Sequence, residues 1–425
     1  MSRRVFVLGV GLLAWIFGAR MACASEVDVL LRKLVEKGIL TAPEAQQVRE
    51  ETAEEAAKAE PQKQEAAASG LPDWVKNIKM KGDFRLRYQY NHADDTLNDR
   101  HRARIRLRLG LEGKVNDKLA AGVGLATGLS DGSADAARST NATLANGFSK
   151  KDIALDYAYV TYAPKDWIEF VGGKFHNPLW EPTDLVWDGD INPEGGAISF
   201  KTALTDNCDV FLNTGVFILD EDNAPGQNDD PMMYVVQPGF NYKATDKVSV
   251  KGAFSVNDSA NVKGNTLNGT GATNSTAGGG LRYDFLVLEP ALQVDVKKPF
   301  GFLDIGRLSD IESLAVFTQY VNNTIPDDNN TGFAAGFKLG SAKIAKFGDW
   351  QFKYIYAMLE RDAVLDVLPD SDRYSGKTGI RSHEGVFEFG LGKNTVLGLD
   401  IYRSWSLIGG KNPETVVQMD WNVKF

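Results

Sequence analysis

The side chains best suited to chemistry in this sequence are five arginines that recur at every second position within residues 100–108. In a β-strand this spacing places all five on one face, and the intervening positions, which are mostly apolar, on the other. On a soluble sheet such a row of like charges would only repel itself. In a membrane barrel the apolar face meets lipid and the charged face lines an aqueous lumen. We call these residues the arginine ladder, and they favour a transmembrane barrel over a soluble sandwich: Arg100, Arg102, Arg104, Arg106 and Arg108.

The composition leaves strands as the candidates for membrane spans. The chain has 425 residues, of which 43% are hydrophobic, and a mean hydropathy of −0.25. Beyond the N-terminus, no stretch approaches the roughly 20 consecutive apolar residues of a membrane helix. Membrane-spanning strands need no such continuous apolar stretch, because their apolar residues alternate with polar ones. The 42 glycines and the 10% of aromatic residues fit tight turns and aromatic girdles.

Residues 1–24 are predicted to be a secretory signal peptide. Two arginines near the start supply its positive region, residues 5–18 its apolar region, and Ala22-Cys23-Ala24 its cleavage site. Two other interpretations fit less well. The twin-arginine pathway carries folded cargo and would not suit a barrel. A lipoprotein signal at Cys23 would place Arg20 where an aliphatic residue belongs.

The mature chain is acidic and has one cysteine. After removal of residues 1–24, 44 basic residues would face 56 acidic ones, which is a net charge of −12. This charge argues against nucleic acid as a partner. Because Cys208 would be the one cysteine left, the sequence allows neither an intrachain disulfide nor a cysteine-based metal site.

Residues 25–70 are predicted to form a short helical or coiled-coil-like segment that ends in a linker. Apolar residues recur at helical spacing within 26–49, and Thr41 with Glu44 forms a capping box. The remaining residues are rich in Glu, Ala, Lys and Gln, which suits a coiled coil or a disordered tether. The segment is either a periplasmic oligomerisation or wall-contacting module, or a solvated helix without such a role.

Residues 71–425 are predicted to form an all-β domain, because the hydrophobic period there is two. Short turns alternate with long polar segments, as in outer-membrane barrels, where turns occupy one rim and loops the other. We expect an antiparallel transmembrane barrel of sixteen strands, since an even number leaves both chain ends on the periplasmic side. The predicted strands are 79–90, 100–113, 118–128, 152–162, 167–176, 196–203, 208–218, 232–243, 247–257, 279–297, 310–322, 332–340, 349–360, 384–391, 395–405 and 415–425.

The last predicted strand shows the clearest alternation. Its odd-numbered residues from Val417 to Phe425 are apolar, and the even-numbered residues between them are polar. A terminal phenylalanine that closes such a strand is similar to the signal that the barrel-assembly machinery recognises in outer-membrane proteins. We therefore expect that machinery to be a partner through the strand that ends at Phe425.

With these features the chain resembles the bacterial putative porin family, which is distantly akin to the phosphate-selective porins. Four segments carry the resemblance: residues 34–41, 100–128, 172–178 and 184–195, of which the last, DLVWDGDINPEG, is the most specific. Together they mark a likeness from about residue 26 to the C-terminus. The family implies a channel in the outer membrane of a Gram-negative bacterium, a homotrimer and no cofactor.

A barrel of sixteen strands is wide enough for an aqueous channel, and its selectivity depends on what narrows and charges it. Arg85 and Arg87 lie next to the arginine ladder across the first hairpin, so these seven basic residues are expected to line the pore. We expect the loop after the fifth strand to fold into the lumen, where its acids would face the arginines and create a transverse field. These constriction-loop acids are Glu181, Asp184, Asp188, Asp190 and Glu194.

Both charge clusters also have an interpretation without a role in conduction. Acids on neighbouring strands, namely Asp83, Glu112 and Asp156, could neutralise the arginines and simply stabilise the wall. The acidic loop could stay at the surface and bind a divalent cation, or lipopolysaccharide through bridging ions. Residues 188–190 are too few for a calcium loop, and no metal site is predicted.

Enzyme chemistry finds little support in the sequence. The four histidines lack metal-pair spacing, and neither G-x-S-x-G nor H-E-x-x-H occurs. A glycine-rich stretch at 122–128 has the wrong spacing for a dinucleotide loop. An outer-membrane hydrolase would need a serine and a histidine that only folding brings together, and we predict no enzyme.

Three hypotheses of function follow. The first is a non-specific or weakly selective diffusion porin for small hydrophilic solutes and ions. The second is an anion- or oxyanion-selective channel along the arginine ladder. Aspartates that reach into the constriction would disfavour it, and an acidic loop held outside would favour it. The third is a barrel that acts as a scaffold for a periplasmic partner. Outer-membrane lipid and lipopolysaccharide are expected partners of the barrel.

Overall fold

The computed structural model describes residues 33–37, 41, 46, 77–94, 99–129, 134–145, 147–221, 230–269, 272–302, 309–410 and 412–425. The chain divides into two compact units, Met1–Lys76 and Asn77–Phe425. In the first unit, residues 33–36 and residue 46 are helical. The predicted signal peptide and most of the predicted helical segment and tether lie outside the described residues.

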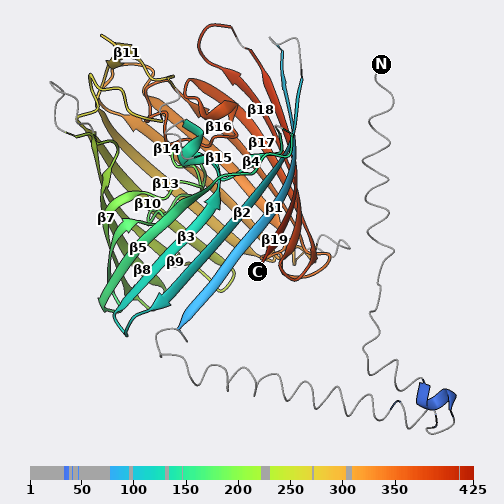
Figure 1. Cartoon of the computed structure of the whole chain (residues 1–425). Helices are drawn as coiled ribbons and strands as arrows, with labels where there is room; N and C mark the ends of the chain where they lie inside the picture. The colour runs from blue at the N-terminus through green and yellow to red at the C-terminus, as the bar shows by residue number, and fades with distance from the viewer. Residues whose placement is uncertain are drawn as a thin grey trace. The chain divides into compact units, whose positions relative to one another are not determined.

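The second unit is a closed antiparallel barrel (Figure 1). In the described part of the chain, sixteen long strands pair in sequence order, and the last pairs with the first, from Asp83 opposite Lys424 to Ala93 opposite Glu414. The predicted sixteen-stranded barrel is therefore confirmed. Its strands are β1 (Ile78–Ala93), β2 (Arg100–Lys114), β3 (Leu119–Thr127), β5 (Ile153–Lys165), β6 (Ile168–Lys174), β7 (Glu194–Thr205), β8 (Cys208–Ile218), β9 (Met232–Lys243), β10 (Val248–Ala260), β13 (Phe285–Lys297), β14 (Ser313–Asn323), β15 (Thr331–Gly340), β16 (Trp350–Leu359), β17 (Ile380–Gly392), β18 (Thr395–Ser406) and β19 (Glu414–Lys424).

The remaining described elements are short and belong to the long connections. A two-residue strand, β4 (Ala142–Thr143), pairs with β2, and β11 (Thr276–Ala277) pairs with β12 (Gly280–Leu281) in a separate small hairpin. Two single turns of helix are α5 (Ala134–Arg138) and η2 (Tyr374–Gly376). The strand predicted over 279–297 begins instead at Phe285, because Gly278 and Gly279 adopt positive φ and turn the chain back.

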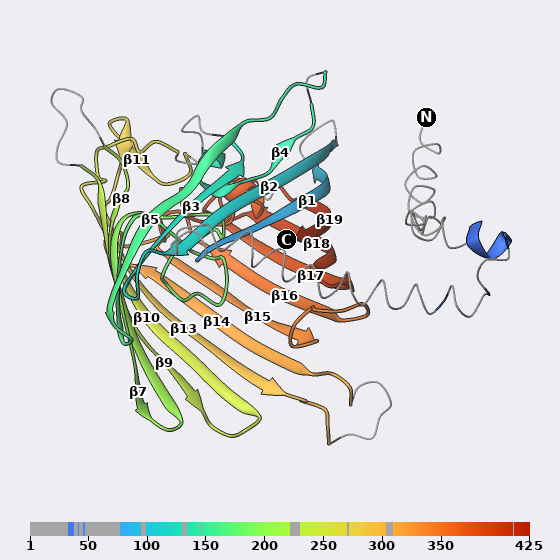
Figure 2. The same cartoon turned by 60° about the horizontal axis from the view of Figure 1, so that its bottom comes forward.

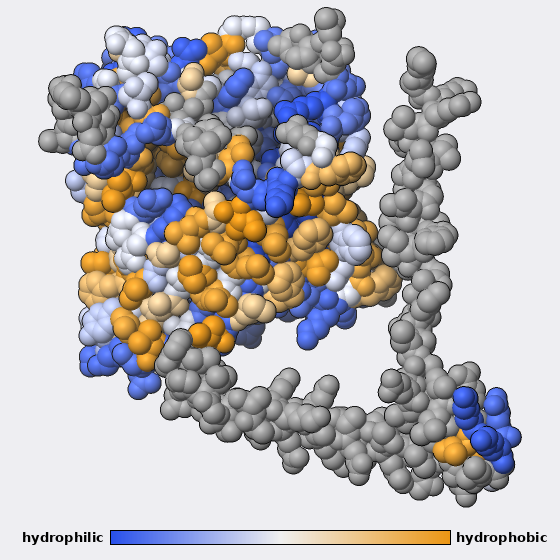
Figure 3. All heavy atoms as spheres, in the orientation of Figure 1, coloured by the Kyte–Doolittle hydropathy of each residue, from blue (hydrophilic) through white to orange (hydrophobic). Residues whose placement is uncertain are grey.

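Apolar and polar residues alternate between the outer and inner faces of the barrel wall, as expected for a membrane barrel. On β1, Phe84, Leu86 and Tyr88 are 37–43% exposed on the outer face, whereas Arg87 and Gln89 are buried on the inner face. On the side seen in Figure 3, apolar residues gather in a broad band across the strands, with hydrophilic residues at the two margins. In the portion of the chain that the structure describes, no helix combines the length and the apolarity needed to cross a membrane.

Two long connections enter the ring of strands. We name them the first lumen loop (residues 175–193, between β6 and β7) and the second lumen loop (residues 360–379, between β16 and β17). The first contacts Arg108 on β2 and Gln319 on β14, which lie on different sides of the ring, so it must cross the interior. Figure 2 looks into the barrel and shows green connections inside the ring.

A hydrophobic core lies between these loops and one side of the wall. From the lumen loops it takes Leu185, Val186, Trp187, Leu365 and Leu368. From the wall it takes inward residues of β7–β9 and β13–β17, among them Phe217, Met233, Val287, Phe317, Ile355 and Ile380. The burial of apolar surface thus fixes both loops against this half of the barrel.

Candidate functional site

The arginine ladder and the two arginines of β1 lie on one inward-facing surface. The strands pair in a register that sets Arg85 opposite Arg106 and Arg87 opposite Arg104. Arg87, Arg104 and Arg106 are each less than 10% exposed. The hairpin expected from the sequence therefore brings these side chains together, although like charges directly opposite each other repel.

Acids that each contact two arginines relieve that repulsion. Asp83 lies 2.8 Å from Arg106 Nη2 and 2.7 Å from Arg108 Nε. Asp420, on β19, lies 2.7 Å from Arg87 Nε and 3.3 Å from Arg85 Nε. Asp420 could not be predicted from the sequence, because only the closure of the barrel places the last strand beside the first.

The other two acids that were expected to neutralise arginines have different contacts. Glu112 forms an ion pair with Lys81 at 2.5 Å. Asp156 accepts a hydrogen bond from Asn192 Nδ2 at 3.0 Å. Among the described residues, Asp83 is thus the one of the three predicted neutralising acids that forms ion pairs with arginines, whereas Asp156 acts on Arg108 through its charge alone.

The end of the arginine ladder nearest the long loops donates hydrogen bonds to neutral amide and carbonyl oxygens. Arg104 donates to Gln89 Oε1 at 3.1 Å and to the Asn141 carbonyl at 3.0 Å, and Arg102 donates to Asn91 Oδ1 at 3.2 Å. A cavity of about 370 Å³ opens beside them. Its lining includes Arg100, Arg102, Arg104, Ser139, Asp372 and Glu414.

Asp190 is the acid of the first lumen loop that reaches the arginine ladder. Its Oδ1 lies 3.3 Å from Arg108 Nη1, and its Oδ2 accepts hydrogen bonds from the backbone N–H and the hydroxyl of Thr140. Glu194, which was grouped with the loop acids, is instead the first residue of β7. It is exposed and forms an ion pair with Lys174 at 2.9 Å.

Glu181 anchors the first lumen loop to the opposite wall. Gln319 Nε2 donates to Glu181 Oε2 and to Glu289 Oε1, at 2.6 Å each, and the Thr183 hydroxyl donates to Gln319 Oε1. Nearby, the Gln237 side chain forms hydrogen bonds with both the N–H and the carbonyl of Trp180. Burial and the neighbouring Glu289 raise the pKa of Glu181 well above its usual range.

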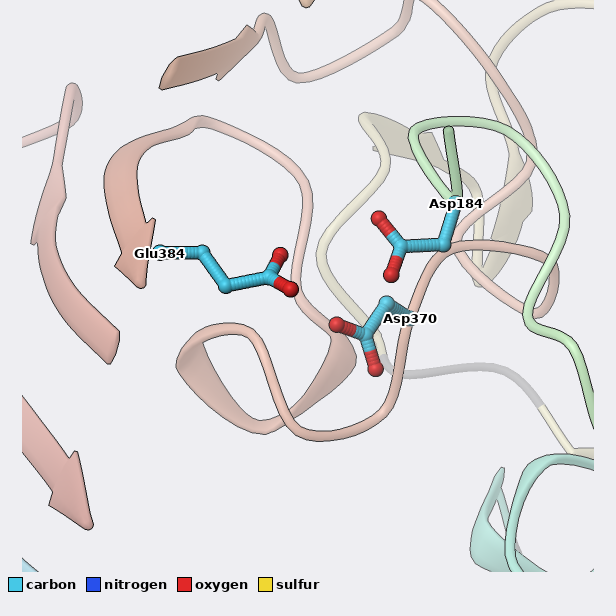
Figure 4. A group of neighbouring side chains, drawn as sticks. All are labelled: Asp184, Asp370 and Glu384. Atoms are coloured by element: carbon cyan, nitrogen blue, oxygen red, sulfur yellow. The ribbon is translucent and has the colours of Figure 1, made fainter. Parts of the chain in front are cut away.

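Arg373 of the second lumen loop joins that loop to the first. Its Nη2 lies 2.7 Å from Asp184, 2.6 Å from Glu384 on β17 and 3.9 Å from Asp370. Figure 4 shows these three carboxylates converging from the two loops and the wall. Their oxygen atoms lie within 4.8 Å of one another, as in a metal site, but the guanidinium already supplies the cation. We call Asp184, Asp370, Arg373 and Glu384 the Arg373 cluster.

Arg138, the last residue of α5, binds the second lumen loop. This side chain is 1% exposed, and its Nη1 donates to the carbonyls of Asp366, Pro369 and Gly376 at 2.9–3.1 Å. Gly376 has a φ of +69°, and a Cβ there would lie 2.5 Å from Arg138 Nη1. Glycine is therefore required at this close approach.

Asp188 lies where the two lumen loops meet. Its Oδ2 accepts a hydrogen bond from the N–H of Ser371 at 2.8 Å, and its own N–H donates to the carbonyl of Leu368 at 2.7 Å. Burial, with a smaller contribution from the charge of Asp190, raises the pKa of Asp188 to about 7. The sequence analysis found this acid but not the second lumen loop that surrounds it.

Sequence comparison identifies the family. A family model described as "Putative porin" matches residues 44–96, 90–287 and 283–425, which together cover most of the chain. This chain belongs to that family. The resemblance noted from the sequence is confirmed, and the porin is an outer-membrane channel for passive diffusion. Family and fold are those of a channel rather than an enzyme.

A solved bacterial porin shares the barrel fold. The high-pH structure of OprB from Pseudomonas putida has a TM-score of 0.54 with 12% identity, over 83% of this chain and 95% of that chain. The outer-membrane channel DcaP of Acinetobacter baumannii has a TM-score of 0.45 with 13% identity, over 82% and 97%. A comparison with curated proteins gave no match. At such identities the likeness to OprB supports the fold alone.

Proposed function

We propose that this porin is a weakly selective diffusion channel whose narrowest section lies between the arginine ladder and the first lumen loop. The contact between Asp190 and Arg108 carries the proposal, because it places an acid of the loop against the basic wall. A solute that passes there meets basic groups on one side and acidic groups on the other. Such a transverse field orients dipolar solutes and admits small ions of both signs.

Charge pairing in this section limits its selectivity. Arg85, Arg87, Arg106 and Arg108 have contacts with four acids, namely Asp83, Asp190, Asp372 and Asp420, of which Asp372 also lines the cavity at the loop end. That part of the wall is close to neutral. The presence of Asp190 at the arginine ladder disfavours strong anion selectivity, since an aspartate in the constriction opposes the passage of anions.

A mild preference for anions is the second candidate. The cavity of about 370 Å³ favours it, because three ladder arginines line this space together with two acids, Asp372 and Glu414. Anions would gather there before they reach the neutralised section. Phosphate or another oxyanion would fit the planar donors of arginine, but free chloride would also be attracted.

The proposal includes an orientation and partners. Both ends of the barrel sequence lie at the rim with the short turns, which suits a periplasmic side for residues 25–70. The backbone of Phe425 exchanges hydrogen bonds with Gly82, so the last strand pairs with the first up to residue 425. We propose the strand that ends at Phe425 as the part that the barrel-assembly machinery recognises. A homotrimer in contact with lipopolysaccharide completes the proposed assembly.

The test is the reversal potential of the purified porin in a planar bilayer under a tenfold potassium chloride gradient. Ideal selectivity gives about 59 mV, and we expect a potential far below that, with anions slightly preferred. Arg104→Ala should move it toward cations, because the cavity loses charge, and Arg106→Ala should do so less, because Asp83 already pairs with Arg106. Lys118→Ala, in an exposed turn, is the matched control.

Three outcomes decide among the hypotheses. Near-ideal anion selectivity that both variants weaken would replace the weakly selective channel with an anion-selective one. A small potential with large conductance supports the proposal. A protein that inserts but carries no current would contradict both and favour the scaffold.

A further inference from the structure

Two arginines lie on the lipid-facing side of the wall, close to the rim with the long loops. Arg381 on β17 and Arg403 on β18 alternate with the inward residues Ser382 and Ser404, so both point outward. Each guanidinium carbon lies 5.6 Å from the ring centre of Trp405, the residue that pairs with Arg381 across the two strands. The two cations therefore flank one indole ring.

The surrounding protein leaves these charges poorly compensated. Arg403 donates to the Thr415 hydroxyl at 2.7 Å and lies 3.6 Å from the exposed Asp94. Arg381 has no carboxylate within 4.0 Å among the described residues, and its guanidinium lies over the ring of Trp405. A cation that faces lipid without an anionic partner is costly, whereas one at the level of the headgroups is stabilised by lipid phosphate.

A wall position without a side chain, which we call the notch, lies directly below the two arginines. Gly385 faces outward between Tyr354 on β16 and Ile401 on β18. Gly385 has no side chain, and a Cβ built on it would meet no heavy atom within 4 Å, so the space over this position is open. Phe387 and Ile401, each 42% exposed, continue the apolar surface toward the centre of the barrel wall. A hydrocarbon chain could lie along this path.

Tyr354 and His383 hold the aromatic part of this surface in place. The Tyr354 hydroxyl and His383 Nδ1 form a hydrogen bond of 2.6 Å, and the His383 ring meets Trp405 edge to face at 5.7 Å. Trp405 thus has an imidazole and two guanidinium groups around it. Aromatic rings at a membrane interface, with cations next to them, are arranged as a headgroup site requires.

We propose that Arg381, Arg403 and Trp405 form an exterior binding site for the phosphate headgroup of an anionic lipid, with one acyl chain in the notch at Gly385. Guanidinium groups bind phosphate through paired N–H donors and are weakly hydrated, so they suit this position better than lysine would. The proposal requires that the barrel spans a membrane, which membership of the porin family shows, and it is independent of the channel's selectivity. The charge of the surface favours lipid phosphate over a second copy of the chain, whose equivalent surface would be equally basic.

Native mass spectrometry of the detergent-solubilised full-length porin tests the site. The probes are dioleoyl phosphatidylglycerol and dioleoyl phosphatidylcholine, which share their chains and differ in net headgroup charge. We expect the porin to retain phosphatidylglycerol at least about fivefold more tightly, and the double variant Arg381→Gln/Arg403→Gln to lose that preference. Lys247→Gln, an exposed lysine in the turn at the opposite rim, should leave it unchanged.

A second variant separates the chain from the headgroup. Gly385→Leu fills the notch while both arginines remain. It should weaken the binding of both lipids by a similar factor. Before lipid binding is compared, each variant must show the heat-dependent shift in gel migration that indicates a folded barrel.

Four results would overturn the proposal. One is equal retention of the two lipids by the unaltered porin. Another is a preference that survives in the folded double variant. A third is displacement of phosphatidylglycerol by inorganic phosphate at millimolar concentration, which would mark the site as one for free anions. The last is a change in the number of protomers, rather than of bound lipid, in the double variant, which would mark the surface as a subunit interface.

Discussion

The two sides of the barrel interior differ in what they offer to the lumen loops. On the side of β7–β9 and β13–β17, the loops bury Leu185, Trp187 and Leu365 against an apolar wall. On the side of β1, β2 and β19, they meet a polar wall at a few charged contacts, such as Asp190 with Arg108. The apolar side holds the loops by packing, and the polar side leaves arginine side chains next to a cavity.

Energetics explain this division. Each fully buried leucine, valine or phenylalanine contributes roughly 1.5–3 kcal/mol, whereas a partly exposed ion pair contributes about 0–1 kcal/mol. The apolar side therefore determines where the loops lie. The charged side is then free to set the field along the pore without having to hold the structure together.

The largest effect is expected from the Arg373 cluster, which joins the apolar side to the loops. Arg373→Ala would leave the buried Asp370 and the partly exposed Asp184 without their nearest cation, at a cost of about 3–5 kcal/mol to loop docking. Single-channel recording should show a larger and noisier current as the loops leave the lumen. Lys377→Ala, an exposed cation in the same loop, is the control. An unchanged trace for Arg373→Ala would mean that apolar packing alone holds the loops.

The apolar side can be weakened without any change of charge. Leu365→Ala removes a side chain that is 1% exposed and should cost about 2–5 kcal/mol. The midpoint of thermal unfolding in detergent should fall, and the current should become noisier with unaltered reversal potential. Leu144→Ala, in a loop and 47% exposed, should change neither. A shift of reversal potential in Leu365→Ala would show that the two sides are not separable.

The docking of the first lumen loop should weaken as pH rises. Glu181 and Asp188 both have a raised pKa in the docked state, so docking binds protons. The stabilisation of the docked loop by these two protonated acids is complete below their ordinary pKa values, 4.5 for Glu181 and 3.8 for Asp188. For Asp188 it is lost progressively up to a pH of about 7. We expect current noise to increase from pH 4 to pH 7.

Neutral variants test the origin of that pH dependence. Asp188→Asn should flatten the change between pH 4 and pH 7, and Glu181→Gln should reduce the dependence above the ordinary carboxyl range. Glu194→Gln, an exposed acid at the start of β7, should leave it intact. If the noise rose equally in all three variants, other groups would have to be responsible.

The smallest effect is expected on the charged side. Asp190→Asn removes the loop's acid from Arg108, so the reversal potential under the potassium chloride gradient should move by a few millivolts toward anions. Conductance and thermal stability should hardly change, because the Thr140 contacts can be kept by an amide. Asp206→Asn, in the exposed turn between β7 and β8, should have no effect on the potential.

The wall was predictable from the sequence, whereas the interior was predictable only in part. Alternation with period two follows from local residue types, so it located sixteen strands and the inward face of the arginine ladder. Asp420 could not be placed beside Arg87 without knowing how the barrel closes. The second lumen loop was treated as an ordinary polar loop, because residues 360–379 owe their burial to distant partners rather than to a local pattern. A signal was present in the apolar run Ala363-Val364-Leu365, which is unusual for a surface loop.

The Arg138 contacts have a consequence for the order in which the molecule is assembled. Arg138 reaches the carbonyl of Asp366 across 228 positions of sequence, and Ser371 reaches Asp188 across 183. Contacts between residues so far apart in the sequence form late in folding, since the intervening chain must first reach its place. A barrel that still lacks β16 and β17 has no second lumen loop to receive Arg138. Obstruction of the lumen is therefore a property of the finished chain, and a partly assembled barrel would leak more than the mature channel does.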